Sequence, residues 1–293
     1  MNLSFELASY QDVPMKNRVV FYHMPKAAGT WVKAQLEHAG IDTFNQTPHP
    51  TARLYMYGQN LPLSDKINGV ETSILLQKSD PTSPGTYENA LKLSTIRNPY
   101  DWMVSYYTHT DDGAKVADGW GNCNRYHGIK SFEEFVDKFT DPEFPWMHQP
   151  IAVIYKRLQC AQWFITAGGC EVQLAIRTER LAEGYNMLAQ GLDIPALEPD
   201  QVPASHVHAS PRRFKKDYRG YYDENSYDKV TTHFSRELQV FGYDFDGPTD
   251  DLSVLDISAM ELTWKFGPNE LSSRGEVVLH SLHSSNQVKL KGT

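Results

Sequence analysis

Cysteine is scarce in this chain, and its placement excludes two common uses of the residue. The 293 residues include three cysteines, Cys123, Cys160 and Cys170, and no two of them stand in a Cys-x-x-Cys spacing. An odd number of widely spaced cysteines does not build a disulfide framework or a thiolate metal site. We therefore expect reduced thiols with structural roles.

Long apolar runs are absent as well. No stretch of 18 apolar residues occurs, and residues 1–6 lack the basic and apolar regions that open a secretory signal. A membrane span or a signal peptide requires such segments. The sequence therefore predicts a protein without a membrane partner, located in the cytoplasm.

Positive charge is the third scarcity. Asp and Glu number 36 against 28 Lys and Arg, which gives a formal net charge of −8. Proteins that bind nucleic acids or heparan-like polyanions need an extended basic surface, so the charge balance argues against such partners. The one dense basic cluster begins at Arg212 and Arg213. It is either a solvated loop or a lid over a negatively charged ligand group.

The length and composition predict one large α/β domain. With 40% hydrophobic and 22% charged residues, a chain of 293 residues can bury a single extensive core. We place this domain at residues 18–246, after an N-terminal extension of residues 1–17. Residues 246–251 are rich in chain-breaking residues, and a β-prone appendage is expected over residues 247–293.

The stretch from Arg18 to Trp31 predicts a strand, a short loop and a helix. Residues 18–22 are typical of a buried strand, and the helix is expected to begin near Gly29. Apolar residues follow at helical spacing, at Val32, Leu36 and Ala39. The first N–H groups of a helix lack intrahelical partners and carry the positive end of its dipole, so they favour a phosphate or sulfate. Lys26 adds positive charge to this loop, and Thr30 adds a hydroxyl donor.

A second strand and helix are expected over residues 91–96 and from Pro99 onward. Asn98 is a good N-cap, proline suits the first helical position, and Asp101 complements the helix dipole in the first turn. The sequence therefore predicts another helix that begins directly after a strand.

Arg97 and Ser105 belong to this second segment and are candidate ligands of one phosphate. Arg97 lies at the carboxyl end of the expected strand, and Ser105 lies about two turns into the helix. A guanidinium binds phosphate bidentately, and a hydroxyl can add a further bond. The alternative makes Arg97 a surface ion-pair partner and Ser105 an ordinary helix residue.

Both segments resemble those of one enzyme family. Pro-Lys-Ala-Ala-Gly-Thr-Trp at 25–31 resembles the 5′-phosphosulfate loop of sulfotransferases that use 3′-phosphoadenosine 5′-phosphosulfate (PAPS). It is not a Walker A loop, because its lysine precedes the glycine. The pattern R-N-P-x-D-x-x-V-S-x-Y at 97–107 resembles the family's 3′-phosphate-binding segment. Weaker similarity continues to about residue 246, with His208 standing where the family usually has asparagine.

The resemblance implies a three-layer α/β fold with a mostly parallel sheet, the P-loop-NTPase-like fold of the sulfotransferases. It implies transfer of a sulfuryl group from PAPS to a hydroxyl of a small molecule, glycan or peptide, with 3′,5′-bisphosphoadenosine (PAP) as product and no metal requirement. The implied cofactor-binding residues are Lys26, Ala27, Ala28, Gly29, Thr30, Trp31, Arg97, Ser105, Arg212 and Arg213. Two alternatives stay open: an ATP-dependent phosphotransferase of the P-loop type, and a nucleotide-binding module without catalysis.

Two catalytic roles remain to be assigned. Lys26 is expected to stabilise the transferring group and the departing phosphate. An alcohol acceptor also benefits from a general base, and His49, in a Pro-rich loop after the first helix, is the first candidate. His23, His109 and Glu88 are the alternatives. Two pairs of histidines have a spacing that could suit a metal, namely His206 with His208 and His280 with His283. No carboxylate or cysteine nearby completes a site with either pair, so no metal site is predicted.

Overall fold

The structure is a computed structural model, and it describes part of the chain. The described residues are 7–24, 26–41, 66–67, 70–71, 89–111, 128–141, 144, 165–166, 169–170, 172–197, 217–258, 262–265 and 276–279. The chain forms two compact units. The first, here called the sheet unit, comprises Met1–Ile96, Cys160–Val207 and Asp251–Thr293. The second, the helical unit, comprises Arg97–Gln159 and His208–Asp250.

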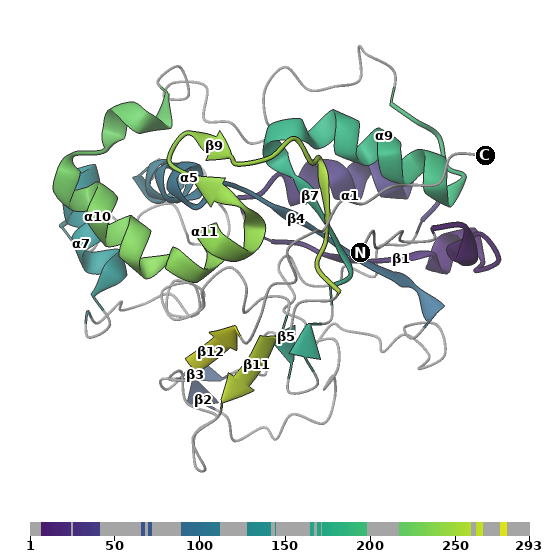
Figure 1. Ribbon diagram of the computed structural model, residues 1–293, viewed down its shortest axis with the longest axis horizontal. Coiled ribbons are helices and arrows are strands. Elements are labelled where there is room, and N and C mark those ends of the chain that lie inside the picture. Colours follow the sequence, from purple (N-terminus) through teal and green to yellow (C-terminus); the bar gives the residue numbers. More distant parts are fainter. Residues whose placement is uncertain are drawn as a thin grey trace. The chain divides into compact units, whose positions relative to one another are not determined.

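The sheet unit is a mixed α/β structure built on a mostly parallel four-stranded sheet (Figure 1). Its strands are β1 (Val19–Tyr22), β4 (Leu91–Ile96), β7 (Leu174–Arg177) and β10 (Val254–Asp256), in that spatial order. The first three strands are parallel to one another, and β10 is antiparallel to β7. Both expected strands are confirmed, and the carboxyl ends of β1 and β4 lie side by side because Tyr22 pairs with Ser94.

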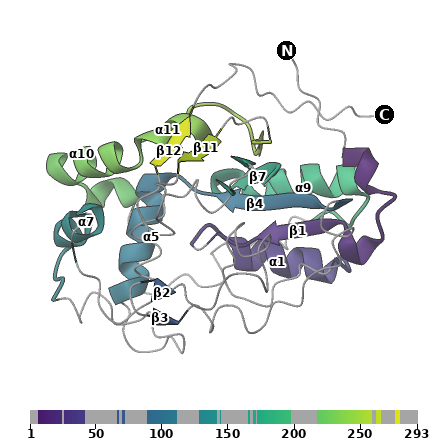
Figure 2. The same ribbon diagram turned by 90° about the horizontal axis from the view of Figure 1, so that it is seen from below.

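Two helices cover the same face of this sheet. Helix α1 (Gly29–His38) and helix α9 (Leu181–Leu192) lie beside each other in Figures 1 and 2. The Trp31 ring of α1 packs edge-on against the Tyr185 ring of α9, with 5.9 Å between the ring centroids. Under the helices lie alternate strand residues, including Val19, Phe21, Leu91, Leu93, Leu174, Ile176 and Val254. Val20 and Ala175 are fully buried too, so both faces are covered, as parallel sheets require.

The N-terminal extension packs against the sheet unit from residue 7 onward. It contains two 3₁₀ turns, η1 (Leu7–Tyr10) and η2 (Met15–Asn17). Leu7 is buried so closely against α9 that a Cβ at Gly191 would stand 2.4 Å from its Cδ1. The guanidinium of Arg18 then donates to the Leu192 carbonyl over 2.8 Å. Leu7 and Arg18 thus anchor this extension to the sheet unit.

The C-terminal stretch differs from the appendage expected at 247–293. It returns to the main sheet as β10, whose three residues are too short to show a strand pattern in the sequence. The β-prone residues 276–279 are confirmed as strand β12 (Glu276–Leu279), which pairs with β11 (Leu262–Lys265). Further short antiparallel pairs are β2 (Lys66–Ile67) with β3 (Val70–Glu71), and β5 (Ile165–Thr166) with β6 (Gly169–Cys170).

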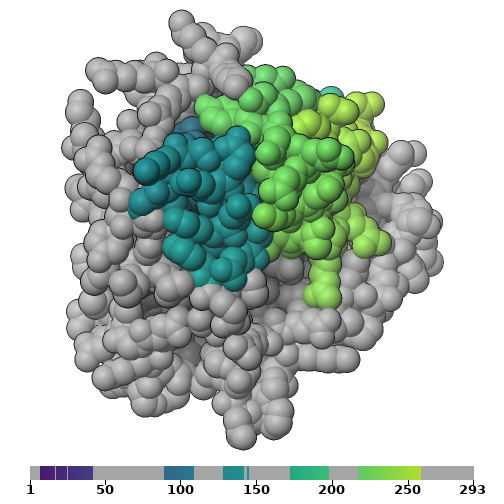
Figure 3. Space-filling model, turned by 90° about the vertical axis from the view of Figure 1, so that its left-hand side faces the viewer, coloured from purple at the N-terminus to yellow at the C-terminus, as the bar shows by residue number. Residues whose placement is uncertain are grey.

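The helical unit is held together by aromatic side chains. Its elements are α5 (Pro99–Asp111), α7 (Phe132–Thr140), η7 (Tyr218–Tyr221), α10 (Glu224–His233), α11 (Ser235–Phe241), β8 (Tyr243–Asp244) and β9 (Gly247–Pro248). The Trp102 ring of α5 packs against Phe139 of α7 and Phe234 between α10 and α11, at centroid distances of 5.9 and 6.0 Å. Figure 3 shows the surface of α7, in teal, directly beside the green surface of α10. At that border Lys229 pairs with Asp137 over 2.6 Å.

The stretch from Glu224 to Phe241 forms two helices, α10 and α11, rather than one. The chain leaves helical geometry at Phe234, which has φ −102° and ψ 17°. The apolar side chains of Val230, Phe234, Leu238 and Phe241, which recur at helical spacing, are nevertheless all buried. Burial of the Phe234 ring against Trp102 and Phe139 outweighs continuation of the helix. Within the described ranges, no helix is long and apolar enough to cross a membrane.

Candidate anion-binding site

The loop between β1 and α1 has an unusual backbone. Lys26 has φ 61° and Ala28 has φ 57°, both in the left-handed region that L-residues rarely adopt. Within the described part of the chain, Asp193 is the only other non-glycine residue with positive φ. Such residues persist only where the surrounding structure enforces them, and they concentrate at ligand sites. The loop therefore departs from an ordinary strand-to-helix turn.

Helix α1 begins without a capping side chain. Ala28 occupies the N-cap position and its side chain makes no capping hydrogen bond. Its carbonyl accepts the N–H groups of Trp31 and Val32 at 3.0 and 3.3 Å. The N–H groups of Gly29 and Thr30 stand at the first two positions of the helix, where no intrahelical acceptor is available, so they can only bind atoms outside the helix ladder. With the helix dipole, they favour an oxyanion.

Gly29 is required here for a steric reason that the sequence did not reveal. A Cβ at this position would stand 2.1 Å from Cδ2 and 2.8 Å from Nε2 of the His23 imidazole. His23 itself is only 8% exposed and lies 6.1 Å from the Phe21 ring, centroid to centroid. The imidazole therefore packs directly against the first residue of α1. His23, an alternative for the base, is brought to the start of this helix.

The other loop residues differ in their surroundings. Ala27 is buried, Lys26 and Ala28 are half-buried, and Thr30 is exposed. The ring of Trp31, which the sequence assigned to cofactor binding, lies in the core of the sheet unit against α9. The structure thus gives the Trp31 ring a packing role.

The second segment begins with a well-formed helix cap in the helical unit. The Asn98 side-chain oxygen accepts the N–H of Tyr100 over 3.0 Å, and Pro99 is the first residue of α5. The cap and the proline position are therefore confirmed. The Asn98 amide also donates to the Asp244 carbonyl over 2.8 Å, which ties the start of α5 to the β8–β9 hairpin.

Arg97 is a buried ion-pair partner rather than a surface one. Its side chain is 7% exposed, and its Nε and Nη2 atoms each lie 2.7 Å from Oδ2 of Asp101. Asp101 was expected only to complement the helix dipole, yet the i, i+4 spacing of an arginine and an aspartate could have indicated this pair. Ser105 lies one turn beyond Asp101 and is 2% exposed. The helical unit thus places Arg97, Asp101 and Ser105 along the first turns of α5.

The charge of Asp101 acts on Tyr218 of η7 and on Tyr222, which follows it. Burial raises the pKa of Tyr218 to about 12 and holds the pKa of Tyr222 well above its ordinary value, and the negative charge of Asp101 adds to both shifts. The Tyr222 hydroxyl donates to the Tyr100 carbonyl over 2.8 Å, and that of Tyr218 donates to the Phe245 carbonyl. These bonds fasten η7 to α5 and to the β8–β9 hairpin.

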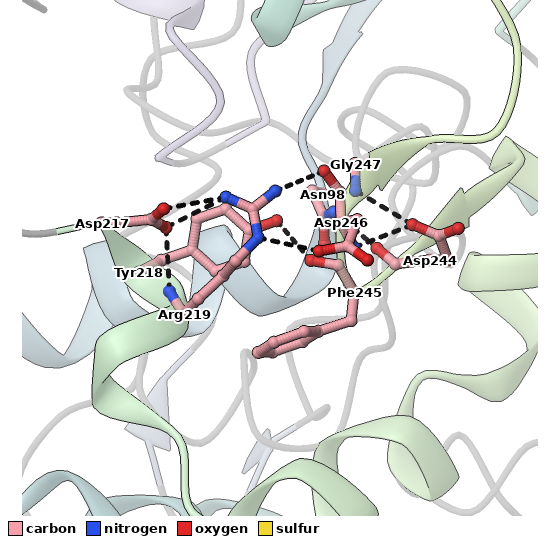
Figure 4. A network of polar contacts seen from close by, with 8 residues as sticks. All are labelled: Asn98, Asp217, Tyr218, Arg219, Asp244, Phe245, Asp246 and Gly247. Carbon is pink, nitrogen blue, oxygen red and sulfur yellow. Dashed lines mark hydrogen bonds and ion pairs between the residues drawn. The ribbon is translucent and has the colours of Figure 1, made fainter.

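A network of exposed charges reinforces this attachment, as Figure 4 shows. The Arg219 guanidinium lies between Asp217 and Asp246, at 2.9 Å from Asp217 Oδ2 and 3.1 Å from Asp246 Oδ1. The backbone N–H and the side chain of Arg219 lower the pKa of Asp217. Asp244 accepts the N–H groups of Asp246 and Gly247, which shapes the hairpin turn. Sequence reasoning did not predict this network.

Several predicted site residues lie outside the described residues: His49, Glu88, Arg212 and Arg213. His109 is described only as part of the α5 backbone. Among the side chains that the structure describes, no group of three or more His, Cys, Asp or Glu residues is arranged to hold a metal ion.

Comparisons with known proteins leave the function to be argued from these residues. No protein-family model, no curated protein and no solved structure matches the chain at a significant level. Each unit contributes one segment suited to an anion: an uncapped helix start beside Lys26 in the sheet unit, and a buried arginine on α5 in the helical unit.

Proposed function

We propose that this protein is a PAPS-dependent sulfotransferase that sulfates a hydroxyl group of a small molecule, glycan or peptide. The observation that carries the proposal is the left-handed backbone at Lys26 and Ala28 directly before the uncapped start of α1. A strained loop of this kind at the carboxyl end of a parallel strand is where α/β proteins bind phosphorylated ligands. The proposal includes the three-layer, P-loop-like fold of that family.

The loop residues fit a phosphosulfate. Gly29 presents backbone without a side chain, so an oxyanion can approach its N–H closely. Lys26 supplies the positive charge that a departing phosphate needs, and the exposed Thr30 hydroxyl is a further donor. These groups bind oxygen atoms directly and need no bridging metal.

The second anion in the proposal is the 3′-phosphate of PAPS, bound by Arg97 and Ser105. A buried guanidinium recognises a phosphate more strongly than an exposed one, because water screens it less. The 3′-phosphate is absent from ATP and AMP, so this pair would select PAPS and PAP among adenine nucleotides. Arg212 and Arg213 are proposed to cover the same nucleotide.

The proposed reaction is a direct in-line transfer. The acceptor oxygen forms a bond to sulfur as the bond between sulfur and the 5′-phosphate oxygen breaks, and PAP leaves with the electron pair. Lys26 and the α1 amides stabilise the charge that develops on the bridging and equatorial oxygens. The acceptor proton passes to a general base, for which His49 is the first candidate and His23, His109 and Glu88 are the alternatives.

The decisive experiment is PAPS-supported sulfation of a panel of alcohols, phenols and glycans, read by mass spectrometry. We expect a mass gain of one sulfuryl group on at least one class of acceptor, with the same rate in the presence of a magnesium chelator. Phosphoryl transfer from ATP that stops when magnesium is removed would replace the proposal with a phosphotransferase. Tight PAP binding without turnover on any acceptor would replace it with a binding module.

Nucleotide preference tests the proposal independently of the acceptor. We expect PAP to bind about a hundredfold more tightly than AMP, because an arginine left without its phosphate loses a charged hydrogen bond. Arg97→Ala should remove most of this preference, as measured by calorimetry. Equal affinities of the wild-type protein for PAP and AMP would contradict the assignment of the second segment.

A further inference from the structure

Asp101 bonds to the Arg97 guanidinium through two of its nitrogen atoms. One of its oxygens, Oδ2, lies 2.7 Å from both Nε and Nη2 of Arg97. A guanidinium is planar and rigid, so two bonds along its Nε–Nη2 edge fix the direction of the whole group. The neighbouring Nη1–Nη2 edge then points away from Asp101 in a defined direction.

Burial separates this pair from ordinary helix-surface ion pairs. The exposed fractions of the Arg97 and Asp101 side chains are 7% and 27%, against 28% and 50% for Lys33 and Glu37. The Arg180–Glu183 pair is similarly exposed, at 32% and 52%. An exposed pair exchanges partners with water and orients neither side chain strongly. A pair with a buried arginine, a half-buried aspartate and two short bonds is held more firmly in one geometry.

The surroundings of Asp101 support the same reading. Its charge acts on the phenols of Tyr218 and Tyr222, and η7 is bonded to α5 and to the hairpin. Asp101 is therefore bonded to Arg97 on a helix to which the η7 segment is fastened. A carboxylate in such a setting supports the side chain beside it, as second-layer residues do at metal and phosphate sites.

We propose that Asp101 is a positioning residue for nucleotide recognition: it holds the Arg97 guanidinium so that its outer edge meets the 3′-phosphate of PAPS or PAP. This inference rests on the proposed function, because Arg97 binds that phosphate only if the protein is a PAPS enzyme. Asp101 itself does not touch the nucleotide. Its contribution is to restrict the conformations of the Arg97 side chain before the nucleotide binds, so that less conformational entropy is lost on binding.

The test is the ratio of AMP to PAP dissociation constants, measured by calorimetry on the full-length protein at one salt concentration. Asp101→Ala should lower this ratio about tenfold and leave AMP affinity almost unchanged. Asp101→Asn keeps an acceptor oxygen in the same place and should lower the ratio by only about threefold. Asp137→Ala, which breaks the exposed pair with Lys229 in the same unit, is the matched control and should leave the ratio unchanged.

A double-mutant cycle separates positioning from a general structural effect. If Asp101 acts through Arg97, Asp101→Ala should not change the ratio further in a protein that already carries Arg97→Ala. An equal loss of PAP and AMP affinity in Asp101→Ala would overturn the proposal, because a structural defect has no reason to select the 3′-phosphate. If Asp101→Ala does not fold, the test rests on Asp101→Asn. A ratio of AMP to PAP dissociation constants that is unchanged or increased in Asp101→Asn would refute the positioning role.

An increased ratio in Asp101→Asn would mean that Asp101 competes with the phosphate for Arg97.

Failure of the positioning role can be told apart from failure of the proposed function. If the wild-type protein shows no preference for PAP, the function itself is wrong. If the wild type shows the preference and Arg97→Ala removes it while Asp101→Ala retains it, only the positioning role is wrong.

Discussion

At the scale of single residues, the loop before α1 combines backbone strain with N–H groups that have no acceptor within the helix. A left-handed conformation at a non-glycine residue costs on the order of 1 to 3 kcal/mol, and Lys26 and Ala28 both adopt it. The same backbone leads into a helix start without a capping side chain. We interpret this cost as the consequence of holding N–H groups ready for an anion.

Lys26 should matter more for the reaction than for binding. Its charge is most useful as negative charge accumulates on the leaving oxygen, so Lys26→Ala should lower kcat by at least about a hundredfold while PAP affinity changes little. Steady-state kinetics with PAPS and a responsive acceptor measures the effect. Lys33→Ala, on helix α1 after this loop and in an exposed pair with Glu37, serves as the control. A raised KM with unchanged kcat would show that Lys26 only binds.

Gly29 should be intolerant of a side chain because of His23. Gly29→Ala places a methyl group 2.1 Å from the imidazole, so we expect a loss of about 1 to 3 kcal/mol in the free energy of unfolding. Urea denaturation of the single variants and of the double variant with His23→Ala measures the coupling. The alanine at position 29 should cost clearly less when His23 is already alanine. Equal costs in both backgrounds would place the strain elsewhere.

At the scale of elements, capping and periodicity account for the helices of the helical unit. Helix α7 begins where Ser131 accepts the N–H of Glu134 over 3.2 Å, and its four apolar positions are all buried. Those positions are Phe132, Phe135, Val136 and Phe139. Helix α10 begins with a capping box formed by Asp223 and Ser226. Each helix start therefore has a local chemical cause.

The Ser131 cap should contribute measurably to stability. Ser131→Ala removes the acceptor for the Glu134 N–H, and we expect the free energy of unfolding to fall by about 1 kcal/mol. Thermal and urea unfolding followed by circular dichroism provide the measurement. Ser235→Ala is the comparison, because Ser235 is exposed at the start of α11, where no side chain caps the helix. A Ser131→Ala variant as stable as Ser235→Ala would mean that the cap bond contributes nothing.

At the scale of the whole molecule, the chain is divided in a way that its linear order hides. The sheet unit takes residues from the beginning, middle and end of the chain, and the helical unit takes the two stretches between them. The pairing of β10 with β7 completes the sheet, although about 80 residues separate the two strands in sequence. Both units bury tyrosines, so both should respond to alkaline pH.

Stability should fall above pH 10. Burial raises the pKa values of Tyr100, Tyr185 and Tyr218 to about 12, from 10.0 for a free tyrosine. Between these pH values the unfolded chain loses phenolic protons that the folded protein retains, so the unfolded state binds fewer protons and stability decreases as pH rises. Below pH 10 this contribution is fully present.

Urea unfolding at neutral pH and between pH 10 and pH 12 tests the alkaline effect. Phenolate absorbance in the same samples reports the ionisation directly. Tyr185→Phe removes one of these phenols and should make the pH dependence shallower. A free energy of unfolding that stays constant up to pH 12 would show that these tyrosines ionise freely in the folded protein.

The sequence alone determined the elements whose signals are local. The strands at 19–22 and 91–96, the start of α1 at Gly29 and the Asn98 cap follow from periodicity and capping chemistry within a few residues. Such features depend on neighbours along the chain, so they can be predicted from the sequence. The similarity of residues 25–31 and 97–107 to a sulfotransferase pattern is also a local property, and its functional meaning stays a prediction.

Only the tertiary structure decided the features that depend on residues far apart in sequence. The place of β10 in the sheet and the break at Phe234 each arise from contacts that no local pattern encodes. The i, i+4 spacing of Arg97 and Asp101 is local, but the burial of Arg97 depends on the packing of the helical unit. Local chemistry determines which conformations a segment favours. The choice among these conformations depends on the free energy of burial and of long-range contacts, which exists only in the assembled fold.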